Sequence, residues 1–424
     1  DPALARLVDL NGPDLIDYLR TAPAPETTTE AFSDPTVALK VAKEKHEDDL
    51  LEEAASLKKL LGERWHQPRR AQVVRLLEQR LPTPDIPVAV LEWVEGVQID
   101  ALPEPFEERK GLFVAHQLAE VLSYLYNIYQ FVLTDTLKPN SLFWSEGDQS
   151  LFLIDWNVLG RPEEFGAHTL PIFGNTLHRM LVGKTVRWSP PKSYNLDPVS
   201  VGGEEAWSEL TYGAMALIRQ TLLADFDDTD PGELARQLSQ AVEEQWGLWD
   251  LGWERLRAQA ASGEGESAIR HYDLARIKQE GGLDAEDEGR MLAELKTILV
   301  GYAERGRHAA ALITLSWARQ RYPYDPGKPL QTQWARWARW AWLVHSAAYA
   351  DGSGPSDSSR ILVQALRDMA AEKFSRAIDA LGQAAASQYR SALLAEARFW
   401  SIYHRPPSSD HLQALEEIYP TLID

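Results

Sequence analysis

The chain has 424 residues, 44% of them hydrophobic and 25% charged, which predicts a globular protein of two domains rather than a disordered one. Its formal net charge of -20 excludes nucleic acid as the main partner class, because nucleic-acid binding draws on basic residues that release counterions. No apolar run is long enough to span a bilayer, and the lack of cysteine and of histidines at ligand spacing excludes disulfide frameworks and structural zinc sites.

The N-terminal third alternates between strand and helix patterns. Residues 36–42 ("TVALKVA") follow a Ser-Asp-Pro turn signal, and their aliphatic and β-branched side chains predict a strand. Residues 46–65 predict a helix, since leucine and alanine recur at helical spacing and acids precede lysines as the helix dipole favours. The apolar run 86–96 ("IPVAVLEWVEG") predicts a buried strand that leads into a connector.

Helical periodicity dominates from residue 107 onward. Residues 107–128 carry an amphipathic helical pattern, whereas 150–160 ("SLFLIDWNVLG") indicates an aliphatic strand interrupted by Asp155. The small polar run 261–267 ("ASGEGES") is typical of a connection between domains. Between these segments, further helices are expected at 172–182, 205–223 and 232–249.

A second, all-helical region is expected after this connector. Its helices are separated by glycine, proline or serine, and we expect them at 285–304, 307–321, 331–349, 358–371, 373–387 and 389–403. The small-residue faces of "RHAAALITLSWARQRYPYDP" and "EKFSRAIDALGQAAA" resemble tetratricopeptide-type (TPR) helices, although no 34-residue period runs through them. The sequence therefore predicts a TPR-like helical-hairpin domain over 265–424.

A tryptophan stripe in this region has two interpretations. "WARWARWAW" places Trp334, Trp337 and Trp340 at three-residue steps with arginines between them. We predict that the stripe packs in the core, because hairpin arrays bury one face of each helix continuously. If the stripe were exposed instead, its tryptophan and arginine side chains would form a protein-binding hot spot.

Taken in chain order, motifs in the first 250 residues resemble the protein kinase family. Lys40 in "VALK" resembles the strand lysine that holds the α- and β-phosphates of ATP, and Glu53 resembles its helical ion-pair partner. Asp155 in "LIDWN" falls at the magnesium-binding aspartate of DFG. "AVLEWVEGVQI" resembles the hinge, whose backbone from Glu92 to Val94 would bond adenine. The resemblance implies that these residues meet in one nucleotide cleft.

The stretch "LTDTLKPNSLFW" resembles the kinase catalytic loop in two registers. In the favoured register, Asp135 and Asn140 match the HRDxxxxN pattern, so Asp135 would be the base, Asn140 a magnesium ligand and Lys138 a further catalytic residue. In the other register, "LKP" matches the family's LKP, and Thr136 and Ser141 take the places of the aspartate and the asparagine. In that second register, the loop lacks both the catalytic base and the metal-binding asparagine.

The chain departs from the kinase pattern at the parts that perform phosphoryl transfer. The glycine-rich loop is replaced by "TAPAPETTTEAF" (21–32), which has no glycine and has two prolines that lack backbone donors. Trp156 and Asn157 replace the phenylalanine and the glycine of DFG. Only 14 steps (169 − 155) separate Asp155 from Thr169, which occupies the position of the family's C-lobe aspartate, and no APE triplet occurs. A peptide substrate would lack its usual platform.

Each of these residues also has a purely structural interpretation. Lys40, considered alone, is typical of a strand lysine that points to solvent. Glu53 lies among other acids and would fit a solvated helix face. Asp155 follows an aliphatic strand, where an acid needs a partner or a ligand to justify partial burial.

We therefore predict an α+β protein with two domains. A bilobal protein-kinase-like domain would cover residues 1–255, with a small β-rich N-lobe at about 1–95 and a helical C-lobe at about 96–255. The all-α helical-hairpin domain would follow at 265–424. Since the chain begins at Asp1 without a signal-peptide pattern, we expect a processed or trimmed cytoplasmic protein with no membrane partner.

The predicted function is a kinase-like regulatory or assembly module, in effect a pseudokinase. It would bind ATP and Mg²⁺ weakly or not at all and would bind a protein partner through its helical domain. One alternative is an active, atypical Ser/Thr kinase that uses Asp135 as base. The other is a protein whose main activity is partner binding by the C-terminal helices, with the N-terminal domain as a platform.

Overall fold

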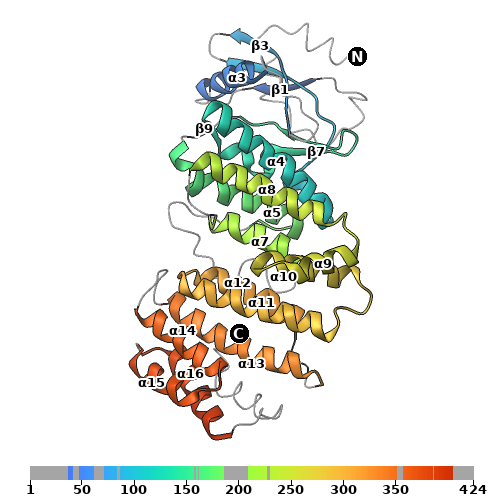
Figure 1. Ribbon diagram of the computed structural model, residues 1–424. Helices are drawn as coiled ribbons and strands as arrows, with labels where there is room; N and C mark the ends of the chain where they lie inside the picture. The colour runs from blue at the N-terminus through green and yellow to red at the C-terminus, as the bar shows by residue number, and fades with distance from the viewer. Residues whose placement is uncertain are drawn as a thin grey trace. The chain divides into compact units, whose positions relative to one another are not determined.

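The computed structural model shows an α+β protein that is mostly helical, with small sheets in its N-terminal region (Figure 1). The segment that stands in place of a glycine-rich loop (21–32) lies outside the residues that the structure describes. None of the described helices is long and apolar enough to cross a membrane. The described residues are 37–41, 47–61, 71–83, 86–156, 159–160, 162–185, 209–226, 230–323, 325, 327–350, 357–384 and 386–403.

The described residues divide into two compact units. The first contains those up to Thr185 together with Ala224–Trp246, and the second contains those of 209–223 and 247–403. Helix α7 (Tyr212–Leu222) belongs to the second unit because it packs against later helices of that unit. This division by contacts differs from the predicted domains, whose kinase-like part extended to residue 255.

The first unit opens with an antiparallel three-stranded sheet and a helix that packs on it. Strand β1 (Val37–Val41) pairs with β4 (Ile86–Glu92), and β4 pairs with β3 (Leu76–Thr83). Helix α3 (Glu47–Leu61), drawn in blue in Figure 1, contacts β3 and β4. The strands expected at 36–42 and 86–96 and the helix expected at 46–65 are thus confirmed, whereas β3 was not predicted.

A second set of strands flanks the loops that contain several of the predicted site residues. β2 (Gln72–Val73) pairs in parallel with β8 (Ser150–Leu153), and β8 forms an antiparallel hairpin with β7 (Leu142–Ser145), which pairs with β5 (Val97–Gln98). Separately, β6 pairs with β9 in an antiparallel ladder; their bounds are Val132–Leu133 and Leu159–Gly160. The predicted strand at 150–160 is therefore two short strands, with Asp155 just beyond the first.

Three helices form the apolar body of the first unit: α4 (Glu108–Tyr129), α5 (Leu170–Val182) and α8 (Pro231–Leu248). A Cβ atom at Gly111 would lie 2.3 Å from Cδ2 of Leu181, so glycine allows α4 and α5 to approach closely. All three helices were expected from their periodicity.

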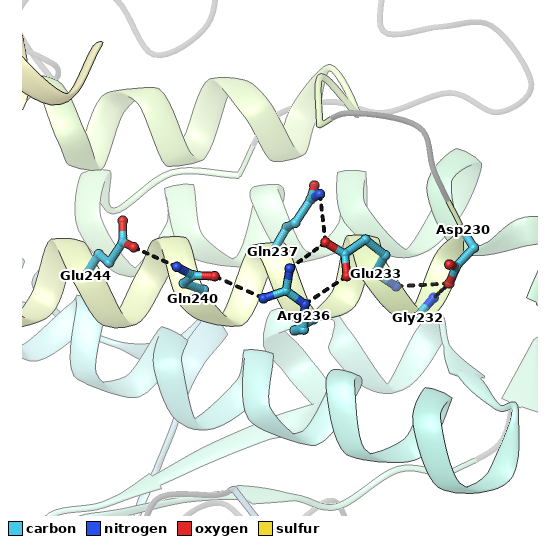
Figure 2. A network of polar contacts seen from close by, with 7 residues as sticks. All are labelled: Asp230, Gly232, Glu233, Arg236, Gln237, Gln240 and Glu244. Carbon is cyan, nitrogen blue, oxygen red and sulfur yellow. Dashed lines mark hydrogen bonds and ion pairs between the residues drawn. The ribbon is translucent and has the colours of Figure 1, made fainter. Parts of the chain in front are cut away.

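Helix α8 is anchored at its start and carries a polar network along its exposed side (Figure 2). The carboxylate of Asp230 accepts bonds from the backbone N–H groups of Gly232 and Glu233, at 2.8 and 3.0 Å, and so caps the helix. Glu233 pairs with Arg236, which also donates to Gln240 at 3.1 Å. These exposed pairs stabilise the helix only slightly, by a few tenths of a kcal/mol each.

The second unit is entirely helical in the part that the structure describes. The predicted helices from residue 285 onward are confirmed to within a few residues at each end, because their apolar faces repeat regularly and are interrupted by turn residues. The helices after α7 are α9 (Trp253–Ser262), α10 (Gly265–Lys278), α11 (Ala285–Glu304), α12 (His308–Arg321), α13 (Pro329–Ala350), α14 (Asp357–Ala370), α15 (Phe374–Gln383) and α16 (Gln388–Tyr403).

The expected connector at 261–267 is wrong as a link between domains. Helix α9 runs to Ser262 and α10 starts at Gly265, so only a tight turn separates two helices that pack against each other within the second unit. Gly265 has φ +59, a left-handed conformation in which glycine is unstrained. The small polar residues therefore mark a helix–helix turn rather than a flexible linker.

The tryptophan stripe is part of the core, as predicted, and the exposed hot-spot interpretation is wrong. Trp334 and Trp340 are each 1% exposed and Trp337 is 4% exposed. Beneath the stripe, the buried carboxylate of Glu396 accepts bonds at 3.2 Å from the indole N–H groups of both Trp340 and Trp400. A buried acid thus satisfies the polar atoms of two large aromatic side chains.

A buried histidine pair should make the second unit sensitive to acid. Nδ1 of His308 and Nδ1 of His345 lie 3.1 Å apart, and both rings are almost fully buried. Burial lowers the pKa of His308; burial and the neighbouring His308 lower the pKa of His345 to about 3. Since both pKa values fall below the unfolded value of about 6.5, the neutral pair is stabilising above that pH, and this contribution is lost as pH falls toward 3.

Below pH 6.5, we expect the wild-type chain to take up protons at these histidines when it unfolds. For each proton taken up, the free energy of unfolding should fall by up to about 1.4 kcal/mol per pH unit. Urea titrations between pH 7.5 and 5 check this, with His308→Asn/His345→Gln as the comparison. In the double variant, the free energy of unfolding should lack the pH dependence that the two histidines cause, even if its stability at pH 7.5 differs from that of the wild-type chain. An equal slope in both proteins would show that the pair does not control the response.

Candidate functional site

Three separate elements bring charged side chains together in the first unit. Lys40 lies in β1, where it is opposite Ala89 of β4. Glu53 lies on α3, and its side chain is 1% exposed because it occupies the buried side of the helix. Asp155 follows the last residue of β8 by two positions, and its side chain is 34% exposed. These three residues form a cluster that we call the Lys40 cluster.

The contacts within the Lys40 cluster are direct. Nζ of Lys40 lies 2.7 Å from Oε2 of Glu53 and 3.0 Å from Oδ1 of Asp155. The backbone N–H of Trp156 donates to Oε1 of Glu53 at 3.2 Å. The interpretations of Lys40 as a solvent-facing strand lysine and of Glu53 as part of a solvated helix face are therefore wrong.

The electrostatics of the Lys40 cluster leave it negatively charged. Burial acts to lower the pKa of the Lys40 ammonium, but the attraction of Glu53 and Asp155 outweighs it and raises that pKa. Burial raises the pKa of the Glu53 carboxyl, and Lys40 only partly offsets this effect. The two shifts therefore have different main causes, since the two carboxylates raise the pKa of Lys40 whereas burial raises the pKa of Glu53. Such a site can attract a further cation or a proton.

Two hydroxyl groups fasten the loop that resembles a catalytic loop, one from helix α5 and one from the π-helical turn directly before it. Oγ1 of Thr169 donates to the carbonyl of Leu133 at 3.0 Å, and Oγ1 of Thr176 donates to the carbonyl of Leu137 at 2.5 Å. Both threonines are fully buried. The backbone between β6 and β7 therefore has fixed support at both ends of its first 3₁₀ turn, which spans Asp135–Leu137.

Within this loop, most of the described side chains are buried, and Asn140 is the exposed exception. Thr136 and Ser141 are 1% and 3% exposed, whereas Asn140 is exposed and its carbonyl accepts a bond from the side chain of Gln98. The carbonyl of Ser141 accepts the N–H of Ile154, the residue before Asp155, at 3.0 Å.

Two further positions of the loop that resembles a catalytic loop complete the placement of the predicted residues. Lys138 is half-buried and precedes a second 3₁₀ turn, Pro139–Ser141. The side chain of Asp135 lies outside what the structure describes. The structure thus joins Lys40, Glu53 and Asp155 directly, and it fixes the backbone of the loop nearby.

The segment that resembles a hinge is a short extended connection after β4. Glu92 holds Arg75, since Nε of Arg75 donates to its carboxylate at 2.6 Å. Trp93 is half exposed and Val94 is half-buried. A Cβ at Gly96 would lie 2.5 Å from the carbonyl oxygen of Trp144, so the chain passes too close to β7 for another residue there.

The segment from Asp155 to Thr169 is short and locally structured. It contains β9, a 3₁₀ turn at Pro162–Glu164 and a π-helical turn at Phe165–Thr169. Phe165 is fully buried against Tyr126, with ring centroids 5.7 Å apart. Asn157 lies outside the described residues.

Sequence reasoning missed two features of this site. The first is Thr176, whose hydroxyl supports the loop; its only signal was a polar residue on an otherwise apolar helix face. The second is the 1% exposed Trp156, whose backbone N–H donates to Glu53. Among the residues described, no group of three or more histidine, aspartate or glutamate side chains is arranged to hold a metal ion.

Comparison with known proteins adds no assignment to this geometry. No protein-family model matches the chain, and no characterised protein matches its sequence. The site must therefore be interpreted from its own residues.

Proposed function

We propose that the first unit is a kinase-like regulatory module that binds Mg²⁺ and ATP weakly and does not transfer phosphate. The Lys40 cluster carries this proposal. A lysine bonded to a helical glutamate and to an aspartate after a strand hairpin is the arrangement that a kinase uses to hold the phosphates and the metal. Three unrelated surface residues would have little reason to converge in this way.

The loop supports the loss of transfer. Ser141 directly precedes β7 and bonds the residue before Asp155, so it fits the family's metal-binding asparagine position better than the exposed Asn140. That register puts Thr136, which is buried and cannot act as a base, in the place of the catalytic aspartate. The favoured assignment of Asp135 as base and Asn140 as metal ligand is therefore the less supported of the two registers.

Partner binding by the second unit remains part of the proposal. Its helices pack as successive neighbours, and an array of this kind offers extended surfaces for another protein. The buried tryptophan stripe takes no part in such a surface. Deleting residues 265–424 would remove helices of the second unit's own core, so surface substitutions are the better route to a partner.

The nucleotide proposal is tested by thermal shift with ATP, with and without Mg²⁺. Ligand at ten times its dissociation constant stabilises the folded state by about 1.4 kcal/mol, so we expect a small upward shift only at millimolar ATP. Asp155→Asn should abolish the part that depends on Mg²⁺, whereas Asp148→Asn, on the β7–β8 turn away from the cluster, should leave it unchanged.

Two results would contradict this proposal. If ATP at several millimolar gives no shift in the wild-type chain, the Lys40 cluster is only a structural ion-pair network. If radiolabelled phosphate is transferred, and the transfer is lost in both Asp135→Asn and Asp155→Asn, the protein is an active kinase instead.

A further inference from the structure

An open hollow of about 630 Å³ lies on the second unit, where the start of α10 and parts of α11, α13 and α14 line it. Its apolar lining residues Ile298, Trp337 and Leu366 are 7%, 4% and 1% exposed, so they offer almost no surface to a ligand. Most of its accessible side chains, such as Thr297 and Arg305, are polar or charged. Because small-molecule sites are mostly apolar and enclose their ligand, this hollow better suits a ligand that stays partly hydrated.

Two positively charged residues of the hollow, Lys296 and Arg305, have no carboxylate at ion-pair distance among the described residues. The Lys296 ammonium lies 5.7 Å from the centre of the Trp337 ring, and the Arg305 guanidinium lies 5.7 Å from the centre of the Tyr302 ring. Burial, together with the positive charge of Arg336, lowers the pKa of Lys296. A half-buried ammonium without a counter-ion is costly, and a carboxylate brought by a ligand would offset that cost.

The acidic residues of the hollow do not compensate these two cations. Glu266 is engaged by Arg219 at 3.2 Å and by the hydroxyl of Tyr302. Glu304 is paired with Arg367. The hollow is therefore locally positive on a chain whose formal net charge is -20. This contrast favours a negatively charged ligand at the hollow, because the excess of acids elsewhere on the chain repels it.

The spacing of the two cations fits an extended peptide. Lys296 and Arg305 are nine residues apart (305 − 296) on and just after α11, which is about 14 Å along a helix at 1.5 Å per residue. An extended chain of about four residues covers that distance at about 3.3 Å per residue, and its alternate side chains point to one side. Between the two cations, Gly301 has no side chain, so a peptide backbone has room to approach α11 there.

We propose that the partner binding of the second unit, on which this inference rests, takes place at this hollow and that the partner's bound segment is acidic and extended. One carboxylate of the segment pairs with Lys296 and another pairs with Arg305, while its backbone crosses Gly301. Ion pairs to partly exposed groups are screened by salt, so this binding weakens as ionic strength rises.

The test uses two acetylated and amidated heptapeptides, Ser-Glu-Ser-Glu-Ser-Glu-Ser and its uncharged counterpart Ser-Gln-Ser-Gln-Ser-Gln-Ser. Isothermal titration calorimetry on the full chain measures both at about 0.01 M and about 0.3 M salt, where the Debye length is about 30 Å and about 6 Å. At low salt, we expect the wild-type chain to bind the glutamate peptide at least about fivefold more tightly, since each of two charge pairs contributes about two- to fivefold. At the higher salt, this preference should fall below about twofold.

Variants show whether the preference arises at the hollow. Lys296→Gln/Arg305→Gln should reduce the low-salt preference to less than about twofold, because it removes both charges that pair with the glutamates. The matched control is Arg376→Gln/Arg398→Gln, which removes the same charge from exposed positions on α15 and α16 that do not line the hollow. It should retain the wild-type preference. Gly301→Leu keeps every charge but fills the path between the two cations, so it should weaken binding of the glutamate peptide. Circular dichroism and the melting temperature confirm that each variant is folded.

Several results would overturn the proposal. Equal affinities for the two peptides in the wild-type chain at low salt, or no binding of either, would show that the hollow does not select acidic segments. A preference that survives Lys296→Gln/Arg305→Gln, or that falls equally in the control variant, would show that these two cations do not create it. Unchanged binding in Gly301→Leu would show that the peptide does not cross the hollow. These results bear on the hollow alone, so they reject neither nucleotide binding by the first unit nor partner binding through another face of the second.

Discussion

Replacing Lys40 with methionine should destabilise the first unit by about 2–3 kcal/mol, because it leaves Glu53 buried without its counter-ion. Glu53 is 1% exposed and, among the described residues, would keep the backbone N–H of Trp156 as its hydrogen-bond partner. The expected loss lies below that for a fully buried pair, since one third of the Lys40 side chain is exposed and solvent screens it.

A double-mutant cycle separates this ion pair from other effects of the substitution. Glu53→Gln combined with Lys40→Met removes both charges, so the double variant should recover much of the lost free energy of unfolding. Arg75→Met is the control, because its pair with Glu92 lies at the surface and is worth at most about 1 kcal/mol. Urea unfolding and hydrogen exchange of α3 measure the changes. Additive single effects would show that Lys40 and Glu53 are not coupled.

Replacing Glu396 with alanine should destabilise the second unit by about 3–5 kcal/mol, the range for removal of one partner of a buried ion pair. The carboxylate is 2% exposed, lies 2.8 Å from Nε of Arg339 and accepts two indole N–H groups. Its loss leaves the partly buried guanidinium of Arg339 and two buried ring donors without this acceptor, and also leaves a void between α13 and α16.

Hydrogen exchange provides a local measurement of this effect. Peptides from α13 and α16 should exchange much faster in Glu396→Ala than in the wild-type chain, while peptides from α4 should be unaffected. Glu286→Ala is the matched control, because its pair with Arg290 is exposed and spaced i,i+4 on one helix, where about 0.5 kcal/mol is at stake. Equal effects of the two substitutions would show that the position of Glu396 under the tryptophans has no energetic importance.

Much of the second unit could be predicted from sequence because its information is local. Apolar side chains recur with helical period, and turn residues mark the ends, so α11 was expected with its observed bounds at 285 and 304. The turn at Gly265 was misinterpreted because its sequence signal is also local. A short small-residue run fits both a linker and a tight helix–helix turn, and only packing distinguishes them.

The Lys40 cluster was predictable from the order of its motifs, whereas the support of the loop was not. Lys40, Glu53 and Asp155 lie in short signatures of a strand, a helix and a strand end, and the structure joins them. Thr169 and Thr176 support the loop by donating to backbone carbonyls. Every residue has a backbone carbonyl, so no residue type in the sequence marks which one accepts the bond. The choice between loop registers depends on which residues face inward, and that follows from tertiary packing.

The two oxygens of Glu53 serve different parts of the unit: one receives Lys40 from β1, and the other receives the amide of Trp156 beyond β8. The carboxylate of Glu53 therefore links helix α3 both to strand β1 and to the segment that follows β8. Rotation of helix α3 about its axis would move the Asp155 segment with it or break one or both of these bonds, so the orientation of the helix is coupled to the position of Asp155.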